Sequence, residues 1–492
     1  MSTKTTRDID SNGRGRMIFA KALVVFHHVN RGDGWAKPFS EYSELCRPEL
    51  EAVLSTYGVE AKIENVLIPD PHGGDIEDCT QARPSLPYLE LHYPLAMRSA
   101  LRSAVRRCVL TEGVYDILCE SNSPTEFKPA SRDPMGPDRV VIVLKRNFGS
   151  DRLKSMKAKR EAMAVWRISM GLNVVAIREP AKGKSAYVWA SDALKRLTTS
   201  EKTKKPRSPN EAIDTLSVVD AGGRCYLARK ICAGCTVDQM YKLRFRSFTT
   251  PTSMQERLCF AAANIAQVCK GDIVWDPFCG SGSLLLPAAH FGGICFGSDI
   301  KLDARTSSNF SRFNLPLPHL FSSSISHPPI KPIPVLASIL TDPPYHIRES
   351  IILPSVPSTP MEGKLTDCEI QNNIVGPSIN IRGARRDDEP KDTQNIPALP
   401  ESRFLAVLHL LAQASKPRLQ PIGRLVFWAP HFIPKERGGS GEGRGFGRKV
   451  ELGMGAVLRA NGFDIEGYYV INTSRRKVVT RALVVARKQG GA

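Results

Sequence analysis

Four consecutive residues, Asp342-Pro343-Pro344-Tyr345, combine a carboxylate, a rigid backbone carbonyl and an aromatic ring. The exocyclic amino group of a nucleobase is a weak nucleophile with two N–H donors. Asp342 can accept one of these hydrogen bonds and the Pro343 carbonyl the other, which positions the nitrogen for attack. Proline fixes φ and so holds that carbonyl in place, while Tyr345 offers a face on which a base can stack. The motif therefore predicts methylation of an amino nitrogen on a flat base, with all four residues in the catalytic site.

A strand is needed to position this motif, and the apolar run 335–340 predicts one directly before it. The motif then lies at the carboxyl end of a strand, where open α/β sheets bind their ligands. Asp-Pro-Pro is also ordinary turn chemistry. Taken alone, the motif supports a functional and a plain turn interpretation equally.

A second motif upstream decides between the two interpretations. The short apolar strand 272–275 runs into a glycine turn at 276–283, which a helical pattern follows at 284–289. The glycines let backbone approach a ligand, and the free N–H groups at a helix start suit a carboxylate. A further strand, 293–298, ends about 20 residues after the turn at an acidic residue placed to bind ribose hydroxyls. The missing third glycine disfavours a dinucleotide, so we predict an S-adenosylmethionine pocket formed by Asp276, Phe278, Gly280, Gly282 and Asp299.

Several segments, in order along about half of the chain, resemble the catalytic subunit of the eukaryotic tRNA (guanine(10)-N2)-methyltransferase family. They are 246–254, 276–289, 341–345, 347–350, 423–428 and 473–476. Weaker similarity at 48–54 and 226–229 extends the resemblance to the first helix and to the strand that closes the family's THUMP domain.

The resemblance implies an α/β chain in which an α+β N-terminal region with a THUMP domain precedes a C-terminal class I (Rossmann-like) methyltransferase domain. It further implies S-adenosylmethionine as methyl donor, N2 of guanosine 10 in tRNA as acceptor, and a heterodimer with a small zinc-binding activator subunit. The substrate-binding residues that we predict from it are Arg246, Arg348, Arg475 and Arg476.

One departure from the family concerns the adenine pocket. The family has an acidic residue after the next strand, whereas this chain has a serine-rich stretch at 321–326. Ser324 can still donate or accept a hydrogen bond but adds no charge. We therefore expect Ser324 to complete the cofactor site with weaker or differently arranged adenine contacts, and a truncated helix between Asp299 and Asp342.

At 492 residues the chain exceeds one ordinary hydrophobic core, so several domains are expected. We predict a flexible tail at 1–17, a ferredoxin-like α/β region at 18–120, a THUMP RNA-binding domain at 121–235 and a methyltransferase domain at 236–492. Within the last, a polar and proline-rich stretch at about 356–402 predicts a disordered insertion, with a substrate lid as the alternative.

The net charge of +19 favours nucleic acid as the partner. Arg98, Arg102 and Arg106 share one face of a predicted helix, where they would either contact phosphates or form a solvated face. Twelve scattered cysteines do not indicate a disulfide scaffold, and a single C-x-x-C at 232–235 does not predict a metal site. With no apolar run of membrane length and no secretory signal, we expect no membrane association and a cytoplasmic location.

Two other functions stay open at this stage. An adenine N6-methyltransferase acting on RNA or DNA would share the Asp-Pro-Pro-Tyr chemistry, and nucleoside analysis of the product would identify it. A non-catalytic RNA-binding protein with a degenerate pocket is conceivable because of the serines at 322–324. Failure to bind S-adenosylmethionine would favour that second alternative.

Overall fold

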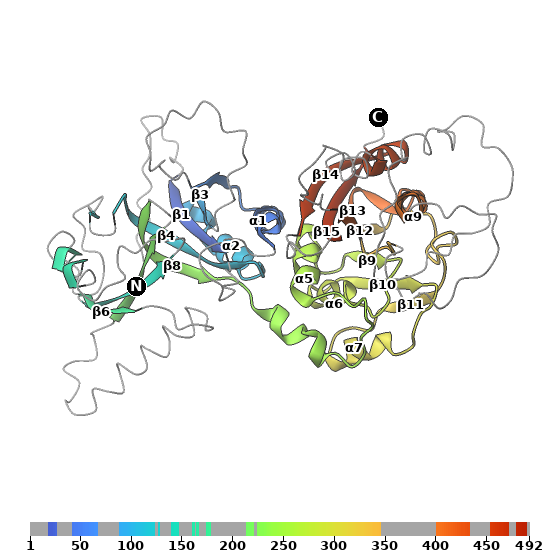
Figure 1. Cartoon of the computed structure of the whole chain (residues 1–492), viewed down its shortest axis with the longest axis horizontal. Coiled ribbons are helices and arrows are strands. Elements are labelled where there is room, and N and C mark those ends of the chain that lie inside the picture. Colours follow the sequence, from blue (N-terminus) through green and yellow to red (C-terminus); the bar gives the residue numbers. More distant parts are fainter. Residues whose placement is uncertain are drawn as a thin grey trace, which may run out of the picture. The chain divides into compact units, whose positions relative to one another are not determined.

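The chain forms two compact units in the computed structural model, Met1–Thr236 and Val237–Ala492 (Figure 1). The structure describes residues 18–26, 42–66, 88–123, 126–127, 139–146, 160–162, 164–166, 174–178, 213–220, 224–345, 400–432, 453–471 and 479–489. Among the helices in these ranges, none is both long enough and apolar enough to cross a membrane.

The N-terminal unit is built on one eight-stranded sheet with the order β2-β3-β1-β4-β8-β7-β5-β6. Its strands are β1 Phe19–Phe26, β2 Lys62–Asn65, β3 Tyr88–Pro94, β4 Thr111–Ser121, β5 Arg139–Arg146, β6 Val174–Arg178, β7 Ile213–Asp220 and β8 Cys225–Ala233. Helices α1, Ser43–Thr56, and α2, Arg98–Val105, pack against each other, and a 3-10 turn, η1 Leu95–Met97, leads into α2. Strand β5 runs parallel to β6 and β7, and the other neighbouring strands are antiparallel.

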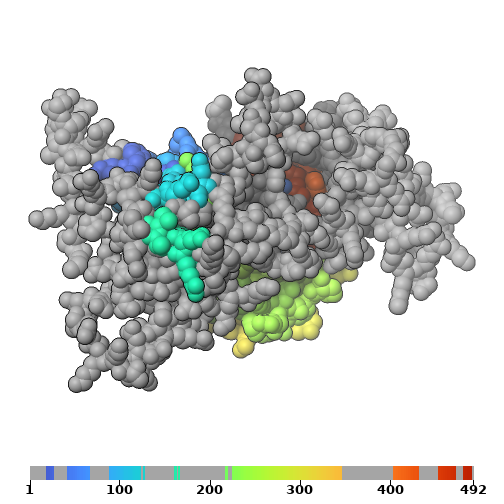
Figure 2. All heavy atoms as spheres, turned by 60° about the vertical axis from the view of Figure 1, so that its left-hand side comes forward, coloured from blue at the N-terminus to red at the C-terminus, as the bar shows by residue number. Residues whose placement is uncertain are grey.

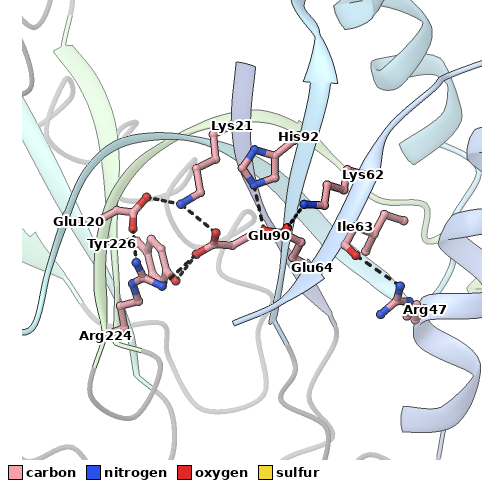
Figure 3. Close-up of polar contacts among 10 residues, drawn as sticks. All are labelled: Lys21, Arg47, Lys62, Ile63, Glu64, Glu90, His92, Glu120, Arg224 and Tyr226. Carbon is pink, nitrogen blue, oxygen red and sulfur yellow. Dashed lines mark hydrogen bonds and ion pairs between the residues drawn. The ribbon is translucent and has the colours of Figure 1, made fainter. Parts of the chain in front are cut away.

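The sheet is continuous across the boundary predicted at residues 120 and 121, because β4 pairs with β8. Ion pairs among a buried carboxylate, Glu90, and partly exposed charges reinforce this junction (Figure 3). Lys21 Nζ lies 2.8 Å from Glu90 and 2.6 Å from Glu120, and Arg224 lies 3.0 Å from Glu120. Tyr226 donates to Glu90 at 2.6 Å, and burial next to that carboxylate raises the pKa of the phenol. Separate domains at 18–120 and 121–235 stay a prediction, but their strands belong to one hydrogen-bonded sheet.

The predicted arginine stripe lies on α2, but its members differ in environment. Arg98 forms an ion pair with Asp116 of β4. Arg102 and Arg106 are exposed. Arg102 and Arg106 therefore present their guanidinium groups to solvent, and neither has a carboxylate partner among the described residues.

The C-terminal unit contains a seven-stranded sheet with the order β11-β10-β9-β12-β13-β15-β14. Its strands are β9 Ile273–Asp276, β10 Ile294–Asp299, β11 His319–Ser322, β12 Leu336–Thr341, β13 Leu419–Phe432, β14 Phe463–Val470 and β15 Val479–Lys488. The first five are parallel, and β15 runs antiparallel between β13 and β14. The helical elements are η2 Val237–Tyr241, η3 Leu243–Phe245, α5 Glu256–Ile265, α6 Leu285–His290, α7 Thr306–Arg312, α9 Pro400–Ser415 and a helix at 453–460.

Helices cover both faces of this sheet, with α5 and α6 on one side and α9 on the other (Figure 1). Residues that follow one another along a strand point to opposite faces of the sheet, and both faces are buried, as expected for parallel strands. Trp275, Ile339 and Leu425 belong to the core cluster that contains α9 residues such as Leu408, while their strand neighbours are buried as well. In the space-filling view, atoms of the green-to-yellow part of the chain form one patch on the visible surface (Figure 2).

The predicted strands at 272–275, 293–298 and 335–340 are confirmed as β9, β10 and β12. Helix α7 is seven residues long, in agreement with the truncated helix expected before Asp342. The predicted tail at 1–17, nearly all of the insertion at 356–402, and Arg348, Arg475 and Arg476 lie outside the described residues.

Candidate active site

The glycine turn begins with a buried carboxyl at the end of β9. Asp276 is 2% exposed and accepts hydrogen bonds from the Phe278 N–H at 3.1 Å and from the Thr341 hydroxyl at 2.5 Å. Burial raises the pKa of Asp276 to about 7, and the neighbouring carboxylates Asp299 and Asp342 add to this effect. The Thr341 bond joins the two predicted motifs directly, because Thr341 immediately precedes Asp342.

Two glycines let the turn adopt a left-handed backbone, with φ of +46° at Gly280 and +77° at Gly282. A Cβ on Gly282 would come within 3.0 Å of the Phe310 ring, whereas the space beside Gly280 is open. The Gly280 N–H donates to Asp299 Oδ2 at 3.0 Å, and the Thr306 hydroxyl donates to the Gly280 carbonyl at 2.8 Å. The turn is thus fixed against both β10 and α7, and it leaves room beside its first glycine.

Asp299 and Ser324 are brought to the same edge of the sheet by the parallel pairing of β10 with β11. Asp299 lies opposite Ser322 in the register, and the Ser323 N–H donates to the Asp299 carbonyl at 3.0 Å. Ser324 accepts a weak bond from the Ser326 N–H at 3.3 Å. The structure therefore gathers the predicted cofactor residues, and Phe278 packs beside them against the core cluster.

Asp342 lies at the carboxyl end of β12, with its side chain 20% exposed. The Tyr345 hydroxyl donates to Asp342 Oδ1, and Arg481 Nη1 donates to Oδ2 at 2.8 Å. The Arg481 guanidinium also lies 5.6 Å from the centre of the Tyr345 ring, whose edge contacts Phe404 at 5.8 Å between centroids. Burial opposes the charge on Arg481, but Asp342 and Tyr345 outweigh it and raise the pKa of the guanidinium.

Arg481 is a site residue that the sequence prediction missed. It stands 139 positions from Asp342 and outside every recognised motif. Strand β15 runs antiparallel to β13, so its first residues lie at the carboxyl edge of the parallel strands. A signal was available in the apolar runs at 467–471 and 481–486, which resemble the antiparallel hairpin that finishes a class I methyltransferase sheet, because an arginine at the start of the second run lies at that edge.

Arg246 does not lie where a substrate-binding residue is expected. It is 8% exposed, and its guanidinium donates to the Tyr241 carbonyl at 3.0 Å, the Ser283 hydroxyl at 2.7 Å and the Met254 carbonyl at 3.2 Å. A buried guanidinium with three internal acceptors is not available to a phosphate. The prediction of direct substrate contact is corrected: Arg246 ties the segment before α5 to the glycine turn.

The strand order and the placement of the two motifs define the C-terminal unit as a class I methyltransferase domain. The glycine turn follows the central strand β9, and Asp-Pro-Pro-Tyr follows the adjacent strand β12. The antiparallel strand β15 lies between β13 and β14. In agreement, a family model described as UPF0020, RMKL-like, methyltransferase domain, matches residues 244–306.

The chain resembles tRNA (guanine(10)-N2)-methyltransferases. It is 32% identical over 219 residues to the "tRNA (guanine(10)-N(2))-methyltransferase" of Saccharomyces cerevisiae, with 42% of this chain and 47% of that protein covered. It is 34% identical over 341 residues to "tRNA (guanine(10)-N(2))-methyltransferase TRMT11" of Xenopus laevis, with 63% of each covered. The matched segments thus span between about half and two thirds of these two relatives.

Among solved structures, TrmN from Thermus thermophilus is similar at 13% sequence identity and a TM-score of 0.38, with 95% of this chain and 99% of that chain covered.

Proposed function

We propose that the chain transfers a methyl group from S-adenosylmethionine to the exocyclic N2 of guanosine 10 in tRNA. The observation that carries this proposal is the 2.5 Å hydrogen bond from Thr341 to Asp276. It holds the end of the β12 strand, with Asp342, next to the glycine turn, so that a methyl acceptor and a methyl donor can meet at one edge of the sheet. The resemblance to the yeast and frog enzymes supports guanine N2 in tRNA as the acceptor.

The donor set around the glycine turn fits S-adenosylmethionine. Asp299 is held by the Gly280 and Lys301 N–H groups and keeps lone pairs for ribose hydroxyls. Open space beside Gly280 leaves room for the methionine portion, and Asp276 offers a buried carboxylate to its ammonium group. When bound, the cofactor supplies an electrophilic methyl group on a positively charged sulfur.

The residues of the Asp342 site orient the acceptor. Asp342 accepts one N–H of the amino group, the Pro343 carbonyl accepts the other, and the Tyr345 ring stacks on the base. Asp342 and the Pro343 carbonyl would hold the amino nitrogen while it takes the methyl group that the bound cofactor would supply. The N–H proton then passes to Asp342 or to water.

The N-terminal unit serves, in this proposal, to bind the tRNA. We assign a ferredoxin-like region to 18–120 and a THUMP domain to 121–235, by resemblance. The exposed Arg102 and Arg106 on α2 offer cations to phosphates, and the net charge of +19 favours a polyanionic partner.

A small zinc-binding activator subunit is the protein partner that the resemblance suggests, and a cytoplasmic location fits it. The C-terminal unit exposes several large apolar side chains around β10 and β11, at Ile294, Ile300, Leu317 and Phe321. Strand β11 is also the last strand at its side of the sheet. A surface of this kind supports the presence of a partner, because exposed apolar clusters mark interaction sites.

The decisive experiment incubates the purified chain with unmodified tRNA and radiolabelled S-adenosylmethionine, with and without the activator subunit. Mass mapping of the product should place N2-methylguanosine at position 10. Detection of N6-methyladenosine in place of N2-methylguanosine would establish the adenine alternative, which no structural observation favours. Failure to bind the cofactor in calorimetry would establish the non-catalytic alternative.

Asp342→Ala tests the catalytic assignment. The variant should lose methyl transfer while its affinities for cofactor and tRNA stay close to those of the wild type, because the carboxylate that it lacks is the acceptor of the amino N–H and contacts Tyr345 and Arg481. Asp303→Ala is a matched control, since Asp303 is an acidic surface residue of the same unit that pairs with Arg305. Wild-type transfer by the Asp342 variant would refute the assignment.

A further inference from the structure

Both oxygens of the Asp342 carboxylate accept hydrogen bonds from groups to which the proposed reaction gives no role, the Arg481 guanidinium and the Tyr345 hydroxyl. Arg481 Nη1 holds Oδ2 at 2.8 Å, and the Tyr345 hydroxyl holds Oδ1. A carboxylate that is to accept an amino N–H must present one oxygen in a fixed direction. One oxygen must therefore give up its present donor to accept the substrate N–H, while the other keeps its donor.

The bond to Arg481 is the more strongly fixed of the two. It joins two opposite charges that are partly buried, with side-chain exposures of 32% for Arg481 and 20% for Asp342. Both bonds end on the carboxylate and are charge-assisted, but only Arg481 adds the attraction of an opposite charge. The arginine backbone lies within a β-strand paired on both sides, opposite Pro430 of β13 and next to Ile471, whose N–H donates to the Arg481 carbonyl at 2.8 Å.

The bond to Tyr345 is easier to replace. Tyr345 follows β12 in a segment without helix or strand structure, and its neutral hydroxyl group can turn to water once another donor arrives. Oδ1 thus already accepts a hydrogen bond from a donor that is carried by an aromatic ring. A stacked base with an exocyclic amino group presents the same two features.

We propose that Arg481 is a positioning residue of the methyl-transfer site, which anchors Oδ2 of Asp342 so that Oδ1 exchanges the Tyr345 hydroxyl for the amino group of the substrate. This inference rests on the proposed function and adds to it a residue outside the recognised motifs. It also gives Tyr345 a second role, as the donor that keeps the carboxylate oriented before the base arrives.

The proposal predicts a separation between kcat and KM. Arg481→Ala should lower kcat about 10- to 100-fold, the loss expected for one hydrogen bond to a charged group. Tyr345→Phe keeps the ring but removes the competing donor, so it should lower KM for tRNA about threefold to tenfold. Arg487→Ala is the matched control on the same strand, because Arg487 pairs with Glu466 away from Asp342 and should not change kcat.

Chemical rescue separates positioning from a purely structural role. Methylguanidinium added at millimolar concentration should restore a measurable part of kcat to Arg481→Ala and leave Arg487→Ala unchanged. A structural defect would lower the melting temperature and the affinity for S-adenosylmethionine, and the added cation would not correct it. Both quantities are therefore measured for each variant.

The outcomes also distinguish this proposal from the function on which it rests. A wild-type chain that methylates no guanosine in tRNA, with or without a partner subunit, overturns the function and the proposal together. An active wild type overturns the proposal alone if Arg481→Ala keeps its kcat, or if the loss of kcat resists rescue by methylguanidinium. A loss of kcat with rescue, together with a lower KM in Tyr345→Phe, supports it.

Discussion

The buried carboxyl of Asp276 should make the stability of the C-terminal unit depend on pH, and Asp276→Asn should remove that dependence. Asparagine has nearly the same shape, and its carbonyl oxygen can still accept from the Thr341 hydroxyl and the Phe278 N–H. It carries no charge at any pH. The variant thus isolates the free-energy cost of ionising this one group in the folded protein.

The sign and size follow from the two pKa values of the carboxyl. In the folded chain the pKa of Asp276 is about 7, above the ordinary value of 3.8. The folded state therefore holds its proton more tightly, and stability falls as the pH rises from about 4 to about 7. The separation of the two pKa values corresponds to roughly 4 kcal/mol, of which about 3 kcal/mol is lost between pH 5 and pH 8.

The assay is urea unfolding of the full chain at a series of pH values, followed by tryptophan fluorescence. Trp275 lies next to Asp276 and Trp428 lies in the same sheet, and both are fully buried. The quantity of interest is the difference in unfolding free energy between Asp276→Asn and the wild type. This difference should shift in favour of the variant by about 3 kcal/mol from pH 5 to pH 8.

Titrating groups that do not interact with Asp276 are shared by the two proteins, so their effects cancel in this difference. Asp303→Asn serves as a control, because Asp303 is an acidic residue of the same unit paired with Arg305. A difference between Asp276→Asn and the wild type that is constant with pH would show that the carboxyl is not held at a raised pKa. The conclusion that burial in the glycine turn raises the pKa of Asp276 would then be wrong.

Two further predictions concern the same region. Gly282→Ala should weaken S-adenosylmethionine binding about tenfold in calorimetry, because a Cβ at φ +77° would press on the Phe310 ring and displace the turn. Gly271→Ala, at φ +87° with open space around it, should leave the affinity unchanged; equal losses would refute the packing argument. Arg246→Lys should lower the melting temperature, because the three internal oxygens that accept from the guanidinium lose donors. It should leave the affinity for tRNA unchanged. The opposite pattern would restore the substrate-binding prediction.

The strands around the cofactor site could be predicted because each is a local pattern. An apolar run followed by a turn with Gly280 and Gly282 specifies a strand, a tight bend and a helix whatever surrounds it. The Asp-Pro-Pro-Tyr motif is likewise local, since one strand end positions both the carboxylate of Asp342 and the ring of Tyr345. The final hairpin at 467–471 and 481–486 was expected by resemblance to class I methyltransferases.

The environment of charged side chains could not be predicted in the same way. Arg246 was expected to bind substrate, yet its segment folds back so that three internal oxygens surround the guanidinium. Arg98 was expected to share a role with Arg102, yet it pairs with Asp116 on a neighbouring strand. Whether an arginine faces solvent, RNA or the core depends on partners that are distant in sequence.

The sequence by itself thus determined the chemistry that the chain carries, a carboxylate and an aromatic ring for an amino group beside a glycine turn for a nucleotide-like cofactor. Only the tertiary structure decided how that chemistry is held. The hydrogen bond from Thr341 to Asp276 joins two motifs 65 positions apart, and the ion pair from Arg481 to Asp342 joins residues 139 apart. The physical reason is that a motif specifies its own backbone, whereas the direction and charge environment of a buried carboxylate are set by neighbours that the sheet order brings together.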